Sequence, residues 1–591
     1  MLPALDSGLR LPHRASAHRT AAAAAPCTAP SVTYATIQDA IDDPNCDPIT
    51  VLAGTFDENL AINRSLTLEG AGSAATIIDP DGGGRVVEVI DASSDTVTIR
   101  DVTLTGGAAL SAGGLAAAQA AHVVTLERVV VTENAAFMGG GLAVGTGASL
   151  TILDSTISSN ATGNIGNTAG AGIAVGTEGT LTLINGTVTG NQTGTSGNPD
   201  RGGGIVNEGT ATITGSSIIG NTAGDEGGGV ANYGTLSVAE SRIEGNGATS
   251  LRGGGIYNAG AATITNSTIG SNTSGNWAGG ISNTGSLTIT GSTVAGNEAT
   301  GASGGIDNDT GGSIDAVNVT VSGNRAGFVG GGVNNDGPGT VTLTNSTVSG
   351  NLADADNSGG EEGGGVTGNT AAVQLRNSIV AGNAVETGST GPDCGSQGGT
   401  SPVSLGGNLI GDTTDCGWIA SSGDLLNVSP LLGPLADNGG PSQTHALLSG
   451  SPAIGAAGPG APPTDQRGLV RTDPDIGAYE LVRCRKVVVN RVGTDANDVL
   501  VGTSGGDGVV ALGGKDRIRT LGGKDGVCGG GGNDRVTAGG GKDRLAGQAG
   551  RDRLSGQGGR DLLVGGAGRD RCTGGGGRDT GRGCEKESKI P

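Results

Sequence analysis

A unit of about 25 residues, closed by an asparagine, repeats through the middle of the chain and constrains the fold more than any other feature. A near-constant period with occasional additions indicates one supersecondary unit per repeat, with the extra residues forming loops before Asn191, Asn221 and Asn383. The closing asparagines are Asn134, Asn160, Asn191, Asn221, Asn246, Asn272, Asn297, Asn324, Asn351 and Asn383, at intervals of 26, 31, 30, 25, 26, 25, 27, 27 and 32 residues.

Short alternating segments within each unit, such as residues 286–290, indicate half-buried strands separated by glycine and asparagine. Three such strands per unit, stacked at roughly 4.8 Å, predict an all-β fold: a right-handed parallel β-helix. An aliphatic column should then point inward, and asparagine columns should act as structural ladders because asparagine tolerates left-handed turns and bonds between coils. The aliphatic column is Ile205, Val230, Ile256, Ile281, Ile306, Val333 and Val366, and a second asparagine column is Asn207, Asn232, Asn258, Asn283, Asn308 and Asn335.

Composition agrees with a narrow aliphatic core, because the chain has 120 glycines and 35% hydrophobic residues but only 2% aromatic residues. The formal charge of -22 argues against nucleic acid as the main partner. The chain has no run of 18 apolar residues, so we expect no membrane span, and we expect a monomer.

Four ordered motifs resemble the choice-of-anchor Q domain, which ends bacterial surface β-helices: NLIGDTTDC at 408–416, residues 430–457, TDQRG at 464–468 and DIGAYE at 475–480. The likeness covers roughly residues 370–482 and implies export and surface residence, with no known chemistry. We expect hydrogen-bonded capping roles for His445 and Asp465 in these motifs rather than catalysis.

From residue 493 the period changes to nine, and ten units run in register without an insertion. Their sixth residue is always aspartate and their eighth is apolar in nine units, failing only at Gly581. The pattern resembles the hemolysin-type (RTX) calcium repeat, which implies a parallel β-roll that binds Ca²⁺ through aspartate and turn carbonyl oxygens. The predicted metal ligands are Asp498, Asp507, Asp516, Asp525, Asp534, Asp543, Asp552, Asp561, Asp570 and Asp579.

Lysine or arginine takes many of the fifth and seventh positions of the nonapeptides. Residues 493–582 hold fourteen Lys or Arg against eleven Asp, a net charge of +3, which leaves -25 for the rest of the chain. These cations could point away from the ligands, weaken calcium binding, or replace some ions by Asp–Arg pairs, and the sequence leaves the three alternatives open.

Eight cysteines at domain edges indicate disulfides and an oxidising, extracellular location. Local spacing predicts Cys27–Cys46 and Cys394–Cys416 and leaves the pairing of Cys484, Cys528, Cys572 and Cys584 open. The N-terminal region lacks the apolar segment of a signal peptide. We divide the chain into a disordered or remnant export segment (1–30), the β-helix (31–390), its choice-of-anchor Q-like cap (391–482), the calcium-binding roll (483–584) and a tail (585–591).

Residues four before each stacked aliphatic position would form a surface stripe suited to a sugar ring, with an extracellular glycan or cell-surface component as partner. The stripe is Arg201, Glu226, Arg252 and Trp277, with Phe328, Glu361 and Glu362 further along, and a solvated ion-paired turn is the alternative interpretation. The repeats carry no paired-carboxylate motif, so we expect a non-catalytic scaffold, with a polysaccharide lyase or glycoside hydrolase as the alternative. An ice-binding face is disfavoured because its TxT column is broken at Ser237/Ala239 and Ala316/Asn318.

Overall fold

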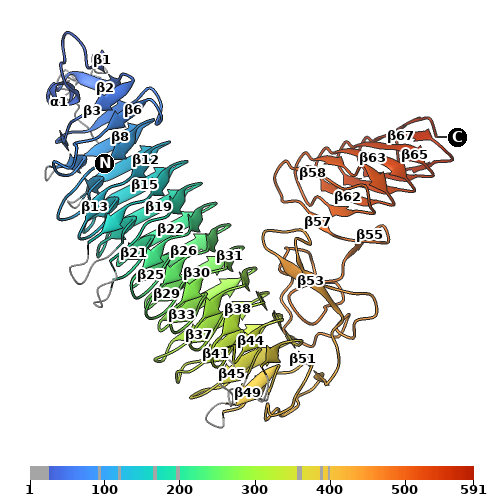
Figure 1. Ribbon diagram of the computed structural model, residues 1–591. Coiled ribbons are helices and arrows are strands. Elements are labelled where there is room, and N and C mark those ends of the chain that lie inside the picture. Colours follow the sequence, from blue (N-terminus) through green and yellow to red (C-terminus); the bar gives the residue numbers. More distant parts are fainter. Residues whose placement is uncertain are drawn as a thin grey trace, which may run out of the picture.

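The computed structural model describes residues 25–90, 95–117, 121–163, 170–194, 200–355, 363–386, 391–396 and 400–590. It confirms the all-β fold class, a long parallel β-helix followed by a β-roll (Figure 1). Residues 1–24 of the expected export segment lie outside the described residues. So do parts of the three expected loops, at 164–169, 195–199 and 356–362.

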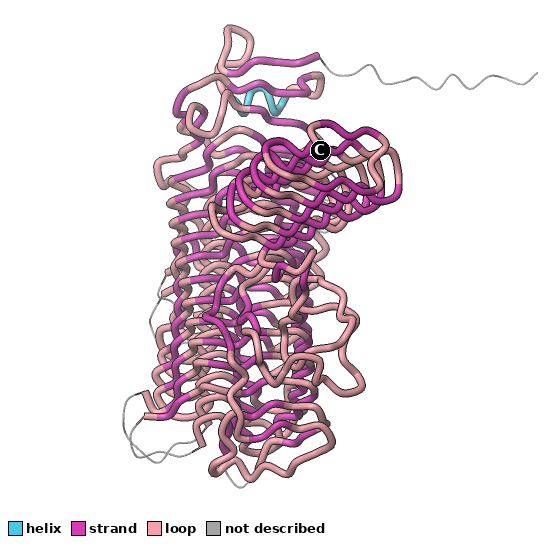
Figure 2. The backbone as a smooth tube through the Cα atoms, turned by 90° about the vertical axis from the view of Figure 1, so that its right-hand side faces the viewer, coloured by secondary structure: helices cyan, strands magenta, loops and turns pink. Residues whose placement is uncertain are grey.

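Three long parallel sheets form the β-helix, and each strand pairs with its counterpart in the next coil. The first sheet has 15 strands, from β1 (Ala25–Ala29) to β50 (Val403–Ser404). The second has 13, from β4 (Leu60–Ile62) to β49 (Cys394–Ser396), and the third has 15, from β3 (Gly54–Phe56) to β52 (Leu425–Leu426). Figure 2 shows these strands stacked in tiers along the helix.

Both kinds of predicted column lie inside the β-helix. The aliphatic column is in register through the second sheet, where Ile205 pairs with Val230 and Val230 with Ile256, all fully buried. In the closing-asparagine column, Asn221 donates its side-chain amide to the Oδ1 atom of Asn246 at 2.9 Å, and the bond repeats from coil to coil. The second asparagine column makes the same contact at 2.7 to 2.9 Å. The asparagine columns are therefore structural ladders.

The second of the two expected breaks in the TxT column lies one residue away from its predicted position. The strand register places Asp315 beside Thr288 and Val317 beside Thr290, where Ala316 and Asn318 were expected. The break itself remains, because neither substituted side chain continues the threonine pair.

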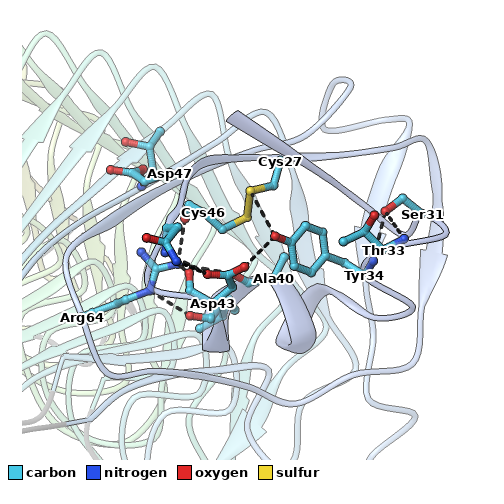
Figure 3. The surroundings of a disulfide bond; sticks show 12 residues. Cys27, Ser31, Thr33, Tyr34, Ala40, Asp43, Cys46, Asp47 and Arg64 are labelled. Atoms are coloured by element: carbon cyan, nitrogen blue, oxygen red, sulfur yellow. Dashed lines mark hydrogen bonds between the residues drawn. A yellow bond between two sulfur atoms is a disulfide. The ribbon is translucent and has the colours of Figure 1, made fainter. Parts of the chain in front are cut away.

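The N-terminal end is closed by the short helix α1 (Ile37–Asp42), which begins with a capping box between Thr36 and Asp39. Strand β1 pairs with β2 (Cys46–Val51), so the first sheet begins before the expected boundary at residue 31. The predicted Cys27–Cys46 disulfide joins these two strands, and the Tyr34 hydroxyl group lies beside it (Figure 3). Arg64 donates hydrogen bonds to the carbonyl oxygens of Asp43 and Cys46, at 2.9 and 2.7 Å, and so ties the cap to the next coil.

Residues 430–480, expected to belong to an end cap, instead run back along the outer face of the third sheet. They contact successive coils through Ser442 Oγ, which donates to the carbonyl of Gly291 at 2.8 Å, and through Thr320, which bonds Gln466 at 2.6 Å. Farther along, the Asn345 amide donates to the carbonyl of Asp475 at 3.1 Å. The segment includes β53 (Leu432–Ala436), which is labelled in Figure 1. It covers hydroxyl side chains of the third sheet that would otherwise face solvent.

Two motif residues in this segment have hydrogen-bonded roles, as expected. The Nε2 atom of His445 lies 2.8 Å from Ser322 Oγ and its Nδ1 atom lies 2.8 Å from the Gly433 carbonyl oxygen. Burial lowers the pKa of His445, which keeps the ring neutral between these partners. Asp465 accepts the backbone N–H of Glu480 at 3.0 Å and pairs with Arg467 at 2.8 Å.

All eight cysteines form disulfides. Cys394 joins Cys416, the second pair that spacing predicts, at the C-terminal end of the β-helix. Two pairs that the sequence left open are Cys484–Cys528, which links the roll to the segment before it, and Cys572–Cys584, near the chain end. Among the described residues, no helix is long and apolar enough to cross a membrane.

Candidate calcium-binding site

The roll has two parallel sheets, and each coil of 18 residues consists of two nonapeptides. The eighth-position side chains, including Ile518, Val536 and Leu554, fill the buried core between the sheets, as the pattern predicts. One sheet contains β57 (Arg491–Val492), β59 (Gly508–Val510), β62 (Gly526–Gly531), β64 (Arg544–Ala549), β66 (Leu562–Ala567) and β68 (Thr580–Arg582). The other contains β58 (Val499–Val501), β60 (Arg517–Arg519), β63 (Arg535–Gly541), β65 (Arg553–Gly559), β67 (Arg571–Gly576) and β69 (Lys586–Ser588), with β61 (Gly522–Gly523) beside β63.

The ten predicted aspartates form two rows, one on each edge of the roll. Within a row, the Oδ1 atom of each aspartate accepts the backbone N–H of the aspartate one coil earlier, at 2.8 to 3.0 Å. The Oδ2 atom of eight aspartates, Asp516 through Asp579, is buried without a hydrogen-bond partner. The first row is Asp498, Asp516, Asp534, Asp552 and Asp570, and the second is Asp507, Asp525, Asp543, Asp561 and Asp579.

Glycines leave room beside these unpartnered oxygens. A Cβ atom on Gly529 would lie 2.6 Å from Asp534 Oδ2 and 2.7 Å from the carbonyl oxygen of Gly547, so the space there is bordered by two oxygens from successive coils. Calcium takes six to eight oxygen ligands at about 2.3 to 2.6 Å. The described residues contain no cluster of three or more His, Cys, Asp or Glu suited to a metal. Backbone carbonyl oxygens, such as that of Gly547, lie beside the carboxylates and are of the kind that calcium accepts. The unpartnered carboxylate and carbonyl oxygens fit calcium.

The turns require glycine for a second reason. Gly550 has a φ of 134°, and a Cβ atom there would lie 1.4 Å from the carbonyl oxygen of Gly532 in the previous coil. Gly559 repeats this contact with Gly541. The fourth position of the nonapeptide therefore excludes side chains sterically and keeps the turn backbones of neighbouring coils in contact.

The cations at positions five and seven do not neutralise the aspartate rows. Within the described part of the roll, the ion pair that reaches a row joins Arg491 to Asp507, at 3.8 Å, and Arg491 precedes the nonapeptides. Arg535, Arg553 and their equivalents are exposed on the outer face. The expectation that these side chains point away from the ligands fits the structure better than the alternative of Asp–Arg pairs.

Burial shifts the protonation of the aspartates in the metal-free roll. Desolvation raises the pKa of Asp534 and of Asp543 to about 6, and it raises the pKa of Asp516, Asp525, Asp552 and Asp561 as well. Since the folded pKa lies above the unfolded value of about 3.9, protonation favours the folded form.

We therefore expect the metal-free roll to be most stable below about pH 4 and to lose that stability as the pH rises through about 6. Hydrogen exchange of roll peptides in chelator, at acidic and neutral pH, measures this directly. Calcium affinity should change in the opposite direction, because protons compete for the same oxygens. Equal protection of roll peptides at both pH values would contradict the assignment.

The predicted surface stripe is also assembled, on the turn that precedes the second sheet. Parallel bridges connect Arg201 to Glu226, Glu226 to Arg252, and Arg252 to Trp277. Glu226 lies 3.4 Å from Arg201 and 3.6 Å from Arg252, and Arg252 also lies 3.3 Å from Asp309. Charges of opposite sign thus alternate along the stripe and balance.

Two tyrosines that the sequence interpretation missed complete this cluster. The Tyr233 hydroxyl donates to Glu226 at 2.7 Å, and burial raises its pKa, so the phenol stays protonated. The Arg252 guanidinium lies 5.6 Å from the Tyr257 ring centre and 5.7 Å from that of Trp277. Phe328 is exposed farther along the helix, whereas Glu361 and Glu362 lie outside the described residues.

Comparison with known proteins identifies the roll. The family model for the RTX calcium-binding nonapeptide repeat matches residues 492–527, 529–554 and 546–580. The chain matches no curated protein. Among solved structures it is similar to a pectate lyase, with 13% identity over 75% of this chain and 90% of the other and a TM-score of 0.29. It is also similar to an alginate lyase of family PL6, with 10% identity over 89% of this chain and 69% of the other and a TM-score of 0.28. The C-terminal segment therefore consists of RTX calcium-binding nonapeptide repeats.

Proposed function

We propose that this chain is an extracellular, calcium-binding surface scaffold without catalytic activity, which contacts carbohydrate through the stripe at Arg201, Glu226, Arg252 and Trp277. The observation that carries the proposal is the convergence of aromatic rings on this stripe. The chain has only four tyrosines and two tryptophans, yet Tyr257 and Trp277 both contact Arg252, and Tyr233 packs against Tyr257.

The chemistry of the cluster suits a sugar better than an ion. Trp277 is 37% exposed and contacts Arg252 with one face, so the rest of the ring can stack on a pyranose. Arg201, Glu226, Arg252 and Asp309 supply donors and acceptors that neutralise one another, which favours hydroxyl groups over a charged ligand.

Truncating Trp277 should weaken binding of its sugar by at least about tenfold, because it removes the stacking surface at the centre of the site. The full-length protein is first tested on a glycan array, and the affinity of Trp277→Ala for a selected glycan is then measured by calorimetry. Ile419→Ala, which removes a side chain that is 82% exposed elsewhere, is the matched control and should leave the affinity unchanged. A protein that binds no glycan, or a control that loses as much affinity, would contradict the proposal.

Catalysis is tested on the same polysaccharides. Release of reducing ends or unsaturated sugars by the intact protein would overturn the non-catalytic interpretation and favour a β-helix lyase or hydrolase. Binding without product agrees with a scaffold.

Export and surface residence are part of the proposal. They rest on the motifs that resemble the choice-of-anchor Q domain, on four disulfides, and on calcium repeats that need the millimolar calcium found outside cells.

A further inference from the structure

One face of the roll carries a column of exposed, positively charged side chains. The strand register of the seven-stranded sheet aligns four seventh-position arginines coil by coil, and Lys586, after the last nonapeptide, continues the line. All are exposed, and none forms an ion pair with a carboxylate among the described residues. This basic column is Arg517, Arg535, Arg553, Arg571 and Lys586.

The equivalent column on the six-stranded sheet has almost no charge. Its register aligns Gly508, Gly526, Arg544, Leu562 and Thr580, with a single cation. The basic column is therefore a property of one face and does not follow from the nonapeptide pattern. Further exposed cations at the fifth position, Arg551 and Arg569, border the same face. They line a groove with four members of the column, from Arg535 to Lys586, and with the carboxylates of Asp534, Asp552, Asp570 and Glu585.

A column of like charges is unfavourable by itself. Neighbouring strands lie about 4.7 to 4.9 Å apart, and like charges directly opposite one another on adjacent strands destabilise a sheet. In the β-helix stripe the problem is absent, because Glu226 separates Arg201 from Arg252. On the roll the charges within the column do not alternate, although Asp534, Asp552, Asp570 and Glu585 lie in the same groove. Further counter-charges from outside the chain would therefore stabilise the column.

Calcium increases the imbalance. The aspartate of the first row lies beneath the column, between its fifth- and seventh-position cations, and its carboxylate partly offsets their charge. Each bound calcium adds two positive charges to a segment that already has a net charge of +3. The calcium-loaded roll is consequently more basic than the metal-free roll and holds the column in one rigid line.

We propose that the basic column binds a linear carboxylated polysaccharide, and that calcium strengthens this binding. The planar guanidinium group matches a carboxylate with two parallel hydrogen bonds, and a polymer with one carboxylate per ring can place successive charges along the column. Duplex nucleic acid, with one charge per roughly 1.7 Å, is denser than the column and would be repelled by the charge of -25 on the rest of the chain. The site is separate from the stripe at Trp277.

The test uses the full-length protein and a short oligogalacturonate, with its methyl ester as the uncharged probe of the same backbone. Binding is measured by calorimetry in calcium and in chelator. Arg535→Gln, Arg553→Gln and Arg571→Gln are combined in one variant, which should weaken binding about tenfold or more, because three charge contacts are lost. The methyl ester should not bind, and chelator should reduce the affinity of the unaltered protein.

The matched control combines Arg544→Gln, Arg560→Gln and Arg578→Gln, which removes the same charge from the other half of each coil. It should keep nearly full affinity, and an unchanged calcium stoichiometry in both variants shows that the roll is folded. Equal losses in the two variants, binding of the ester, or tighter binding of a DNA of equal charge would overturn the proposal. Trp277→Ala should have no effect on this binding, which separates the result from that of the stripe.

Discussion

Chelation of calcium is expected to unfold the roll of the intact protein while the β-helix remains folded. The unpartnered Oδ2 atoms of Asp516 through Asp579 stand in two rows at coil spacing, so their charges repel when no cation lies between them. In the described part of the β-helix, the two ladders consist of uncharged asparagine amides instead. Calcium binding and roll folding should therefore be one equilibrium.

Trypsin reports this equilibrium well, because the roll contains fourteen lysines and arginines. In calcium, residues 493–582 should resist cleavage, and in chelator they should be cut first, leaving a resistant fragment that contains the β-helix. At a free calcium concentration 100 times the Kd, binding at one site stabilises the folded form by about 2.7 kcal/mol, so a few sites suffice for a large effect. Equal resistance with and without calcium would show that the roll folds without the ion.

A single substitution in the first row sharpens this prediction. Asp534→Asn keeps the shape and the acceptor for the backbone N–H of Asp516 but removes the charge that calcium needs. The variant should lose calcium-dependent stability, but in chelator its roll should be at least as stable as that of the unaltered protein, because a buried, uncompensated charge has been removed. Asp495→Asn, an exposed aspartate outside both rows, is the matched control and should behave like the unaltered protein.

Arg467→Ala should be the most damaging single substitution in the segment along the third sheet. Arg467 is buried, pairs with Asp465 at 2.8 Å, and its guanidinium carbon lies 3.7 Å from the ring centre of Tyr479. It also donates to the carbonyl oxygens of Asn438 and Val489, both at 3.2 Å. Its removal leaves the Asp465 carboxylate buried without its cation, which costs about 3 to 5 kcal/mol.

The measurement is thermal unfolding followed by circular dichroism, with hydrogen exchange to locate the loss at residues 430–490. Arg325→Ala is a suitable control, because this exposed arginine makes a 3.9 Å pair with Glu298 and should change stability by less than about 1 kcal/mol. Since Arg467 bonds the backbone on both sides of the connection to the roll, its loss should also loosen the first roll coil. A variant as stable as the control would contradict the central role of this arginine.

Fixed spacing determined what the sequence could predict. The columns at Ile205 and Asn207 and the rows at Asp534 and Asp543 follow from the repeats, because side chains one coil apart lie on neighbouring coils. A coil is one unit of about 25 residues in the β-helix and two nonapeptides in the roll. The order Arg201, Glu226, Arg252, Trp277 followed from the same reasoning.

Features without a period were not predictable in this way. Tyr233 and Tyr257 contact each other in the structure but occupy different positions of their repeat units. Aligning equivalent positions therefore does not pair them, although both lie within three residues of the aliphatic column. Residues 430–480 have no repeat, and their position beside the third sheet depends on single contacts such as Gln466 with Thr320. The pair Cys484–Cys528 closes 44 residues, too far for local spacing to suggest.

The Cys484–Cys528 disulfide fixes the N-terminal end of the roll covalently, while the later coils are held by stacking. Cys484 lies before the first nonapeptide and Cys528 in β62, so the opening coils stay covalently attached to the folded segment beside them when calcium is absent. A disulfide that closes a loop of this length stabilises the folded form by about 4 kcal/mol in the chain-entropy model, because it lowers the entropy of the unfolded chain. Each later coil only has to stack on the one before it, as in a one-dimensional array. The roll should therefore refold from its attached end towards the C-terminus, and the covalent anchor should lower the calcium concentration at which that growth begins.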